Sequence, residues 1–182
     1  MTKLSDLIFL SREWVGSRLT SSLSNSFWKF AEEEVNGYRN NLKAPRWKRI
    51  ENIWIGLIGE YLVFRYCQEK DIKAHYEFPW DREKYGDDIH IVQKSTDVKT
   101  TRKASGLDHI DHRIFLSRNK PSTEEFVLQC ILDMNSLSFV ICSIVPSAGL
   151  RARNNSEGKL ENKSYACAIS EGTPFEEWIN SP

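Results

Sequence analysis

Three ionisable residues lie close together near the middle of the chain, in the segment DDIHIVQKSTDVKTT, residues 87–101. Asp88 and Asp97 are nine residues apart, and Lys99 follows Asp97 by two. In a β-hairpin with an even-length loop, an odd separation puts both carboxylates on one face, and strand alternation puts Lys99 there too. Because turns centred anywhere within 92–95 fit the pattern, the separation of the two carboxylates stays open.

Two carboxylates and an amine on one face suit metal-assisted hydrolysis of a phosphodiester. Mg²⁺ prefers oxygen ligands and keeps several waters, so one or two carboxylates plus a substrate phosphate suffice to hold it. The metal polarises the phosphoryl oxygen and lowers the pKa of a bound water. Lys99 could orient that water or neutralise charge in the transition state. Taken alone, however, a D-x-K triplet fits a strand with one solvated face better than it fits a catalytic site.

A further carboxylate, Glu60, lies in a predicted buried helix. Pro45 predicts the start of a helix that runs to about Gln68. The helix is apolar nearly all round, which is typical of a buried helix. Within residues 53–67 only Glu60 and Arg65 carry charge. A buried carboxylate is costly unless it is paired or bound to a metal, so its partner is either Arg65, a lysine of the sheet, or a metal ion.

This joint pattern resembles the PD-(D/E)XK nuclease superfamily, in which a core helix supplies a glutamate, a hairpin strand supplies an aspartate, and the next strand supplies (D/E)xK. The matching residues are Glu60 in IGLIGEYLVF, Asp88 in YGDDIHI, and Asp97 with Lys99 in TDVKTT. The resemblance covers roughly residues 50–145. It implies a restriction-endonuclease-like core, and it supports the fold and chemistry better than any particular substrate.

The resemblance also implies a set of site residues and a cofactor. The expected catalytic residues are Glu60, Asp88, Asp97 and Lys99. The expected ligands of a Mg²⁺ ion, which Mn²⁺ would replace, are Glu60, Asp88, Asp97 and the backbone carbonyl of Val98. Because the chain has Asp87 where the motif's name has proline, Asp87 stays open as an alternative ligand to Asp88.

The hydrophobic patterns around these residues predict an α/β or α+β fold with a mixed central β-sheet flanked by helices. The predicted elements are a helical region at 1–38, the helix at 45–68, a hairpin at 87–101, strands at 125–133, 137–145 and 163–170, and a short helix at 174–180. We therefore expect a helical N-terminal extension over residues 1–48 and a nuclease-like domain over 49–182, as one compact unit.

A basic stretch, RNNLKAPRWKR at residues 39–49, precedes the buried helix and contains no acidic residue. One interpretation is a surface that contacts phosphates, with Trp47 free to pack or stack; the other is a solvated linker. Basic residues after the hairpin could extend the same surface. The residues expected at a nucleic-acid interface are Arg46, Trp47, Lys48, Arg49, Thr101, Arg102 and Lys103.

Two other sets of residues are weaker candidates for metal sites. The histidines of DHIDHR, residues 108–113, could bind a transition metal, although a substrate-facing or solvated loop fits that segment better. The four cysteines are widely spaced in apolar contexts, which predicts free, buried, reduced thiols. They are Cys67, Cys130, Cys142 and Cys167.

The composition limits the ways in which the protein can contact nucleic acid or a membrane. The 182 residues are 40% hydrophobic and 27% charged with zero formal net charge, so any nucleic-acid contact must use local patches. The longest apolar stretch, at residues 53–59, is far short of the ~20 residues that cross a bilayer. With no secretory signal pattern either, we expect a cytoplasmic protein without a membrane partner. The sequence contains neither a nucleotide-binding motif nor a nucleophile-elbow motif, so it predicts neither an organic cofactor nor covalent catalysis.

The sequence therefore predicts a Mg²⁺-dependent endonuclease that hydrolyses phosphodiester bonds in DNA. One alternative is a module that keeps the nuclease fold and binds nucleic acid or protein without cutting. The complete set of four site residues favours the enzyme, because a protein that keeps the nuclease fold without the activity usually lacks one of them. A third interpretation is a nuclease directed at RNA. A homodimer is compatible with the proposal, since many enzymes that cut duplex DNA use one centre per strand.

Overall fold

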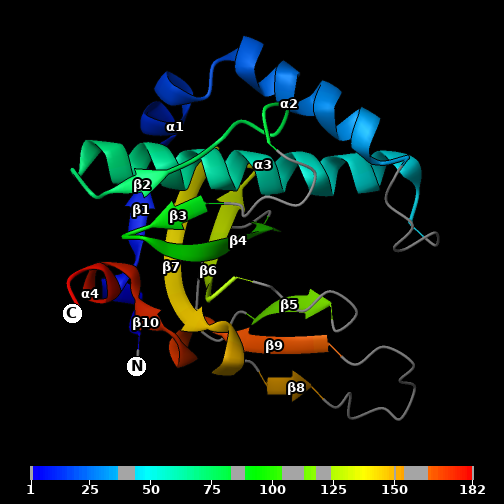
Figure 1. Ribbon diagram of the computed structural model, residues 1–182. Coiled ribbons are helices and arrows are strands. Elements are labelled where there is room, and N and C mark those ends of the chain that lie inside the picture. Colours follow the sequence, from blue (N-terminus) through cyan, green and yellow to red (C-terminus); the bar gives the residue numbers. More distant parts are fainter. Residues whose placement is uncertain are drawn as a thin grey trace.

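The computed structural model describes residues 2–36, 44–82, 89–103, 113–117, 124–149, 151–153 and 164–181. Over these residues the chain forms an α+β fold with a mixed central sheet flanked by helices, as the sequence predicted (Figure 1). The helices are α1 (Arg12–Arg18), α2 (Ser21–Glu34), α3 (Arg46–Glu69) and α4 (Phe175–Ile179), with 3-10 turns at Leu4–Asp6, Ser147–Gly149 and Ile169–Glu171.

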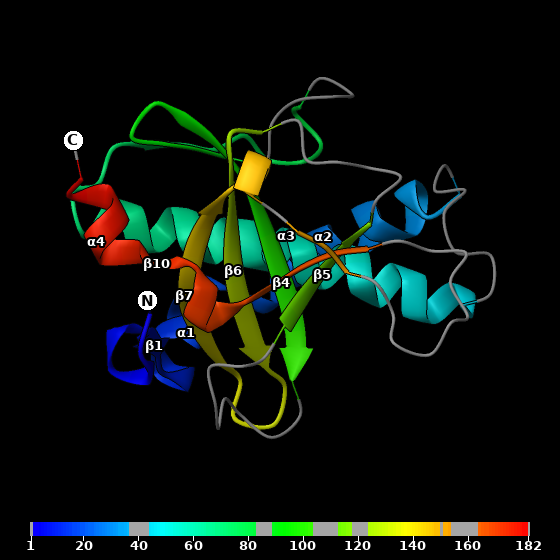
Figure 2. The same ribbon diagram turned by 90° about the horizontal axis from the view of Figure 1, so that it is seen from below.

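The strands form two sheets. The strands are β1 (Ile8–Leu10), β2 (Ala74–His75), β3 (Ile89–Ile91), β4 (Lys94–Lys103), β5 (Arg113–Ser117), β6 (Phe126–Asp133), β7 (Ser138–Pro146), β8 (Arg151–Arg153), β9 (Ser164–Ala168) and β10 (Thr173–Pro174). The central sheet has the order β1-β7-β6-β4-β3-β2, and β10 also pairs with β7. Within it β4 and β6 are parallel, while the other pairs are antiparallel. A small sheet, β5-β9-β8, lies on the side of the central sheet away from α3 (Figures 1 and 2).

Helix α3 is the central packing element, and it begins and ends within one residue of the prediction. It lies between the central sheet and helix α2 (Figure 1). Ile58 and Leu62 on α3 are buried in one core cluster with Leu128 and Cys130 of β6. The alternate β6 residue Ile131 belongs to a separate cluster on the opposite face of the sheet. Because both sides of α3 are covered, its sequence is apolar nearly all round.

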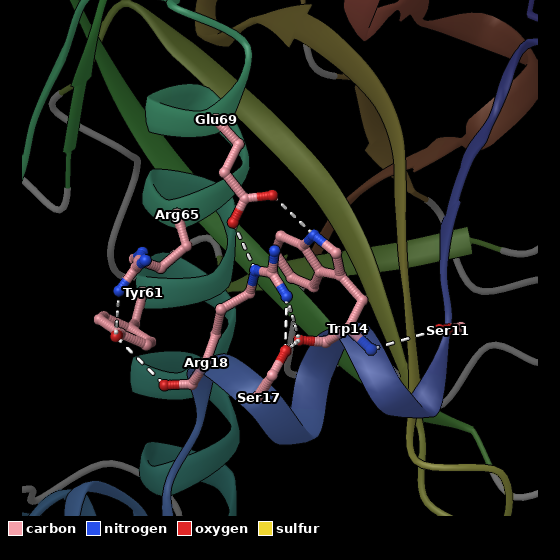
Figure 3. Close-up of polar contacts among 7 residues, drawn as sticks. All are labelled: Ser11, Trp14, Ser17, Arg18, Tyr61, Arg65 and Glu69. Atoms are coloured by element: carbon pink, nitrogen blue, oxygen red, sulfur yellow. Dashed lines mark hydrogen bonds and ion pairs between the residues drawn. The ribbon is translucent and has the colours of Figure 1, made fainter.

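Helix α1 is fastened to α3 by a polar cluster (Figure 3). Arg18 forms an ion pair with Glu69 and lies over the Trp14 ring, with its guanidinium carbon 4.3 Å from the ring centre. The Trp14 indole N–H donates to the other Glu69 oxygen at 2.9 Å. Two turns earlier on α3, the Tyr61 hydroxyl donates to the Arg18 carbonyl at 3.3 Å, and Arg65 donates to that hydroxyl at 3.2 Å. The cluster therefore holds α1 against the helix that carries Glu60.

Replacing Glu69 with glutamine is expected to lower the free energy of unfolding by about 1 kcal/mol at neutral pH. The hydrogen bond from Arg18 holds the pKa of Glu69 below its ordinary value. Because the pKa is lower in the folded state, the stabilisation is fully present when the pH is above the pKa of the unfolded state. It is lost as the pH falls through the pKa of the folded state. The free energies of unfolding of the two proteins, measured with urea, should therefore become equal in acid. A difference that persists in acid would contradict this, and Glu33→Gln, on an exposed position of α2, is the control.

The N-terminal region differs from its predicted all-helical form. Residues Ile8–Leu10 form strand β1, which pairs antiparallel with β7 through Phe9 opposite Val140. The apolar run at residues 7–10 is too short for a helix and alternates between exposed Phe9 and buried Leu10, which suits an edge strand. The helix prediction is wrong for these three residues, and they belong to the central sheet. A further small difference is β8, which is not among the predicted strands.

The cysteine prediction is confirmed for Cys67, Cys130 and Cys142, which are free and buried. Burial raises the pKa of the Cys67 thiol to about 12, so this thiol is an unreactive packing group. The side chain of Cys167 lies outside the described residues. Among the helices in the described part of the chain, none is long and apolar enough to cross a membrane.

Candidate active site

The predicted hairpin is confirmed and its register is now defined. Ile89 pairs with Thr96, and His90 pairs with Ser95. The loop consists of residues 92–93, both with positive φ (51° and 67°), as a two-residue hairpin loop of type I′ requires. This tight loop has the even length on which the same-face prediction depended.

Asp97 and Lys99 share one face of β4, as predicted. The alternate residues Val98 and Thr100 point toward α3, since Val98 belongs to the α3 core cluster and Thr100 lies against Gly59. Asp97 is only 4% exposed and forms an ion pair with Lys99, whose side chain is 41% exposed. A buried carboxylate is thus held beside an amine that reaches solvent.

Helix α3, which carries Glu60, approaches β4 closely at Thr100. A Cβ atom placed on Gly59 would lie 1.7 Å from the Thr100 Oγ1 atom, so the helix and strand are in backbone-level contact here. Among the described residues, the pairing of β3 with β4 runs from Ile91 opposite Lys94 to Ile89 opposite Thr96, and Asp97 follows Thr96 on β4. At this point Glu60 interacts electrostatically with both Asp97 and Lys99.

Glu60 is 7% exposed and its ion-pair partner is Arg82, with 2.6 Å between Oε2 and Nη2. Burial raises the pKa of the Glu60 carboxyl above its ordinary value, and the positive charges of Arg82 and Lys99 oppose that rise. The negative charge of Asp97 adds to it. The partner considered from the sequence, Arg65, instead donates to Tyr61. Arg82 is therefore a residue of the candidate site that the sequence did not indicate.

The donor atoms present suit a hard divalent cation. Glu60 and Asp97 supply carboxylate oxygens, and burial disfavours the ionised form of Glu60. Val98, whose carbonyl was a predicted ligand, lies in β4 between Asp97 and Lys99 and pairs with Leu128. The described residues contain no cluster of three or more metal-ligating side chains. The remaining predicted ligand, Asp88, lies outside those residues, as do Asp87 and residues 108–112.

The two predicted basic segments lie beside each other. Arg102, near the end of β4, donates to Glu51 Oε1 at 2.6 Å, and Glu51 lies in the second turn of α3, just after the basic stretch. Trp47 is 60% exposed, Lys48 is exposed, and Arg46 donates to the Glu32 carbonyl at 3.3 Å. A partly basic surface therefore extends from the start of α3 to the end of β4.

The other predicted interface residues contribute less or are not described. Arg49 is half-buried, and its Nε atom has no partner within the described part of the chain. Thr101 is half-buried on the same face of β4 as Asp97 and Lys99. The side chain of Lys103 lies outside the described residues.

Comparison with known proteins does not identify the chain: no family model, no curated protein and no solved structure matches it.

Proposed function

We propose that the protein is a metal-dependent endonuclease of the PD-(D/E)XK type, with a restriction-endonuclease-like core, and that it hydrolyses phosphodiester bonds in DNA. The observation that carries the proposal is the electrostatic interaction of Glu60, on a buried helix, with Asp97 and Lys99 on a hairpin strand. Burying the Glu60 and Asp97 carboxylates is costly for stability by itself. Groups with a perturbed pKa, as Glu60 has, concentrate at functional sites.

In this proposal Glu60, Asp88, Asp97 and the Val98 carbonyl hold Mg²⁺ or Mn²⁺. When bound, the metal would polarise the scissile phosphate and supply a water of lowered pKa. Lys99, whose amine reaches solvent from beside Asp97, would stabilise negative charge on the phosphate. Arg82 would keep Glu60 charge-balanced when no metal is bound.

The direct test is incubation of the purified protein with supercoiled plasmid in Mg²⁺, in Mn²⁺ and in EDTA. The proposal expects nicked or linear DNA with either metal and intact plasmid in EDTA. Plasmid that stays intact with both metals, while a matched single-stranded or branched substrate also stays intact, would contradict it.

Reversing the charge of Arg46 and Lys48 to glutamate is expected to weaken DNA binding by roughly tenfold or more at low salt, because each phosphate contact adds a salt-dependent electrostatic contribution. The slope of affinity against salt concentration should fall as well. Lys73→Glu, an exposed lysine beyond the other end of α3, is the matched control and should change binding little. Fluorescence anisotropy with labelled DNA measures this, and equal affinity of the variant and the wild type would exclude the surface.

One observation favours the second candidate, a module that binds without cutting. Both carboxylates of the cluster already have a positively charged partner, Glu60 with Arg82 and Asp97 with Lys99. Such pairs could be purely structural. The two candidates differ in one measurable property, because a structural cluster would bind no Mg²⁺ or Mn²⁺ and isothermal titration calorimetry would detect no heat from either ion.

A further inference from the structure

An exposed tryptophan lies close to the candidate site and is not used by the proposed chemistry. Trp80 is 44% exposed, although a tryptophan usually buries most of its surface. Its ring is stacked on Phe78, with 5.0 Å between centroids and 8° between planes. Phe27 supports it from α2 at 5.7 Å. The indole thus packs against two aromatic rings, while part of it faces solvent.

The turn that presents Trp80 is tied to the site by Arg82. The Asp81 amide donates to the Phe78 carbonyl at 2.8 Å, which closes the turn around Trp80. The Arg82 Nε atom donates to the Glu77 carbonyl at 2.8 Å, and its Nη2 atom binds Glu60 at 2.6 Å. One guanidinium therefore joins the turn to the site carboxylate. Only Asp81 separates Trp80 from Arg82 along the chain, so their Cα atoms are at most about 7 Å apart.

The aromatic support continues from the turn to Glu60 itself. Phe78 stacks on Tyr61, the residue after Glu60, with 6.1 Å between centroids. Tyr76 packs edge-on against Phe78 and lies beneath the Arg82 guanidinium, 5.1 Å from its ring centre. The position of the indole relative to Glu60 is therefore set by packed rings.

We infer that Trp80 is a stacking platform for an unpaired DNA base, so that the enzyme acts on single-stranded DNA or on unpaired nucleotides within a larger structure. The choice of DNA rests on the proposed function. In duplex DNA each base face is covered by its neighbours, whereas an unpaired base offers its face to an aromatic side chain. Stacking also supplies affinity without net positive charge, which this chain, with zero formal net charge, lacks.

The test is binding of the full chain to a labelled single strand and to the blunt duplex of the same sequence, in EDTA so that no cleavage occurs. Trp80→Leu should weaken single-strand binding by about tenfold and leave duplex binding unchanged, while Trp80→Phe should keep most of the affinity. Phe9→Ala is the matched control, because Phe9 is 57% exposed on β1, at the opposite edge of the central sheet from β2 and β3. Thermal unfolding of each variant checks that the fold is intact.

Unchanged single-strand affinity in folded Trp80→Leu, or an equal loss on both DNA forms, would overturn the inference. Tighter Trp80-dependent binding to RNA of the same sequence would overturn the choice of DNA. The proposed function is tested separately, by measuring whether the wild type cleaves plasmid and single-stranded DNA in Mg²⁺. Trp80-dependent binding without cleavage would support the stacking platform and contradict the proposed nuclease activity.

Discussion

Asp97→Asn is expected to lower metal-dependent DNA cleavage by at least about 100-fold while the protein stays folded. Asp97 is the buried carboxylate of the D-x-K triplet and interacts with both Glu60 and Lys99. Asparagine has the same shape but removes the negative charge that a divalent cation requires. The change loses the ion pair with the partly exposed Lys99 but also removes repulsion between Asp97 and Glu60, so the fold should lose little stability. Initial cleavage rates together with the midpoint of thermal unfolding measure the two effects.

Glu51→Gln is the matched control for Asp97→Asn. Glu51 also joins α3 to β4 through an ion pair, with Arg102, but it lies outside the cluster of Glu60 and Asp97. Cleavage by Glu51→Gln should stay close to that of the wild type. Substantial cleavage by folded Asp97→Asn would refute the assignment of the site, and an equal loss in both variants would indicate that the α3–β4 contact matters rather than the charge of Asp97.

Gly59→Ala is expected to lower the free energy of unfolding by about 2 kcal/mol or more. Alanine favours a helix over glycine by about 1 kcal/mol, but the new Cβ would lie 1.7 Å from Thr100 Oγ1 and 2.8 Å from Thr100 Cβ. Rotating the Thr100 side chain relieves the first contact and leaves the second, so α3 must move away from β4. That movement also separates Glu60 from Asp97, so cleavage should fall along with stability.

Gly56→Ala is the internal control, because Gly56 lies one turn earlier on α3 and no described atom lies within 4 Å of a Cβ added there. This change should raise the free energy of unfolding by about 0.5–1 kcal/mol. Urea unfolding of both variants measures the contrast. If the close contact is the cause, Thr100→Gly combined with Gly59→Ala should show a favourable coupling energy, on the order of 1 kcal/mol or more. Equal effects at the two glycines would contradict the explanation.

The site residues that the sequence predicted are those defined by local periodicity. A helix that is apolar on all sides predicts burial of Glu60 without knowledge of its neighbours. Strand alternation places Asp97 and Lys99 on one face of β4 in the same way. Both predictions agree with the structure, because they depend only on residues a few positions apart.

Only the tertiary structure decided which groups meet. Arg82 is 22 residues from its partner Glu60, in a segment with no regular period, so no local pattern indicated the pair. The contact of Gly59 with Thr100 depends on how closely two elements pack, and a lone glycine in a helix does not predict it. The pairing of β1 with β7 spans even more of the chain. The sequence by itself determined helix α3, the hairpin of β3 and β4, and the long strands β6 and β7, since period and polarity are local properties. The tertiary structure decided the ion-pair partner of Glu60, the depth of the helix–strand contact and the exposure of Trp80, since each depends on packing between distant segments.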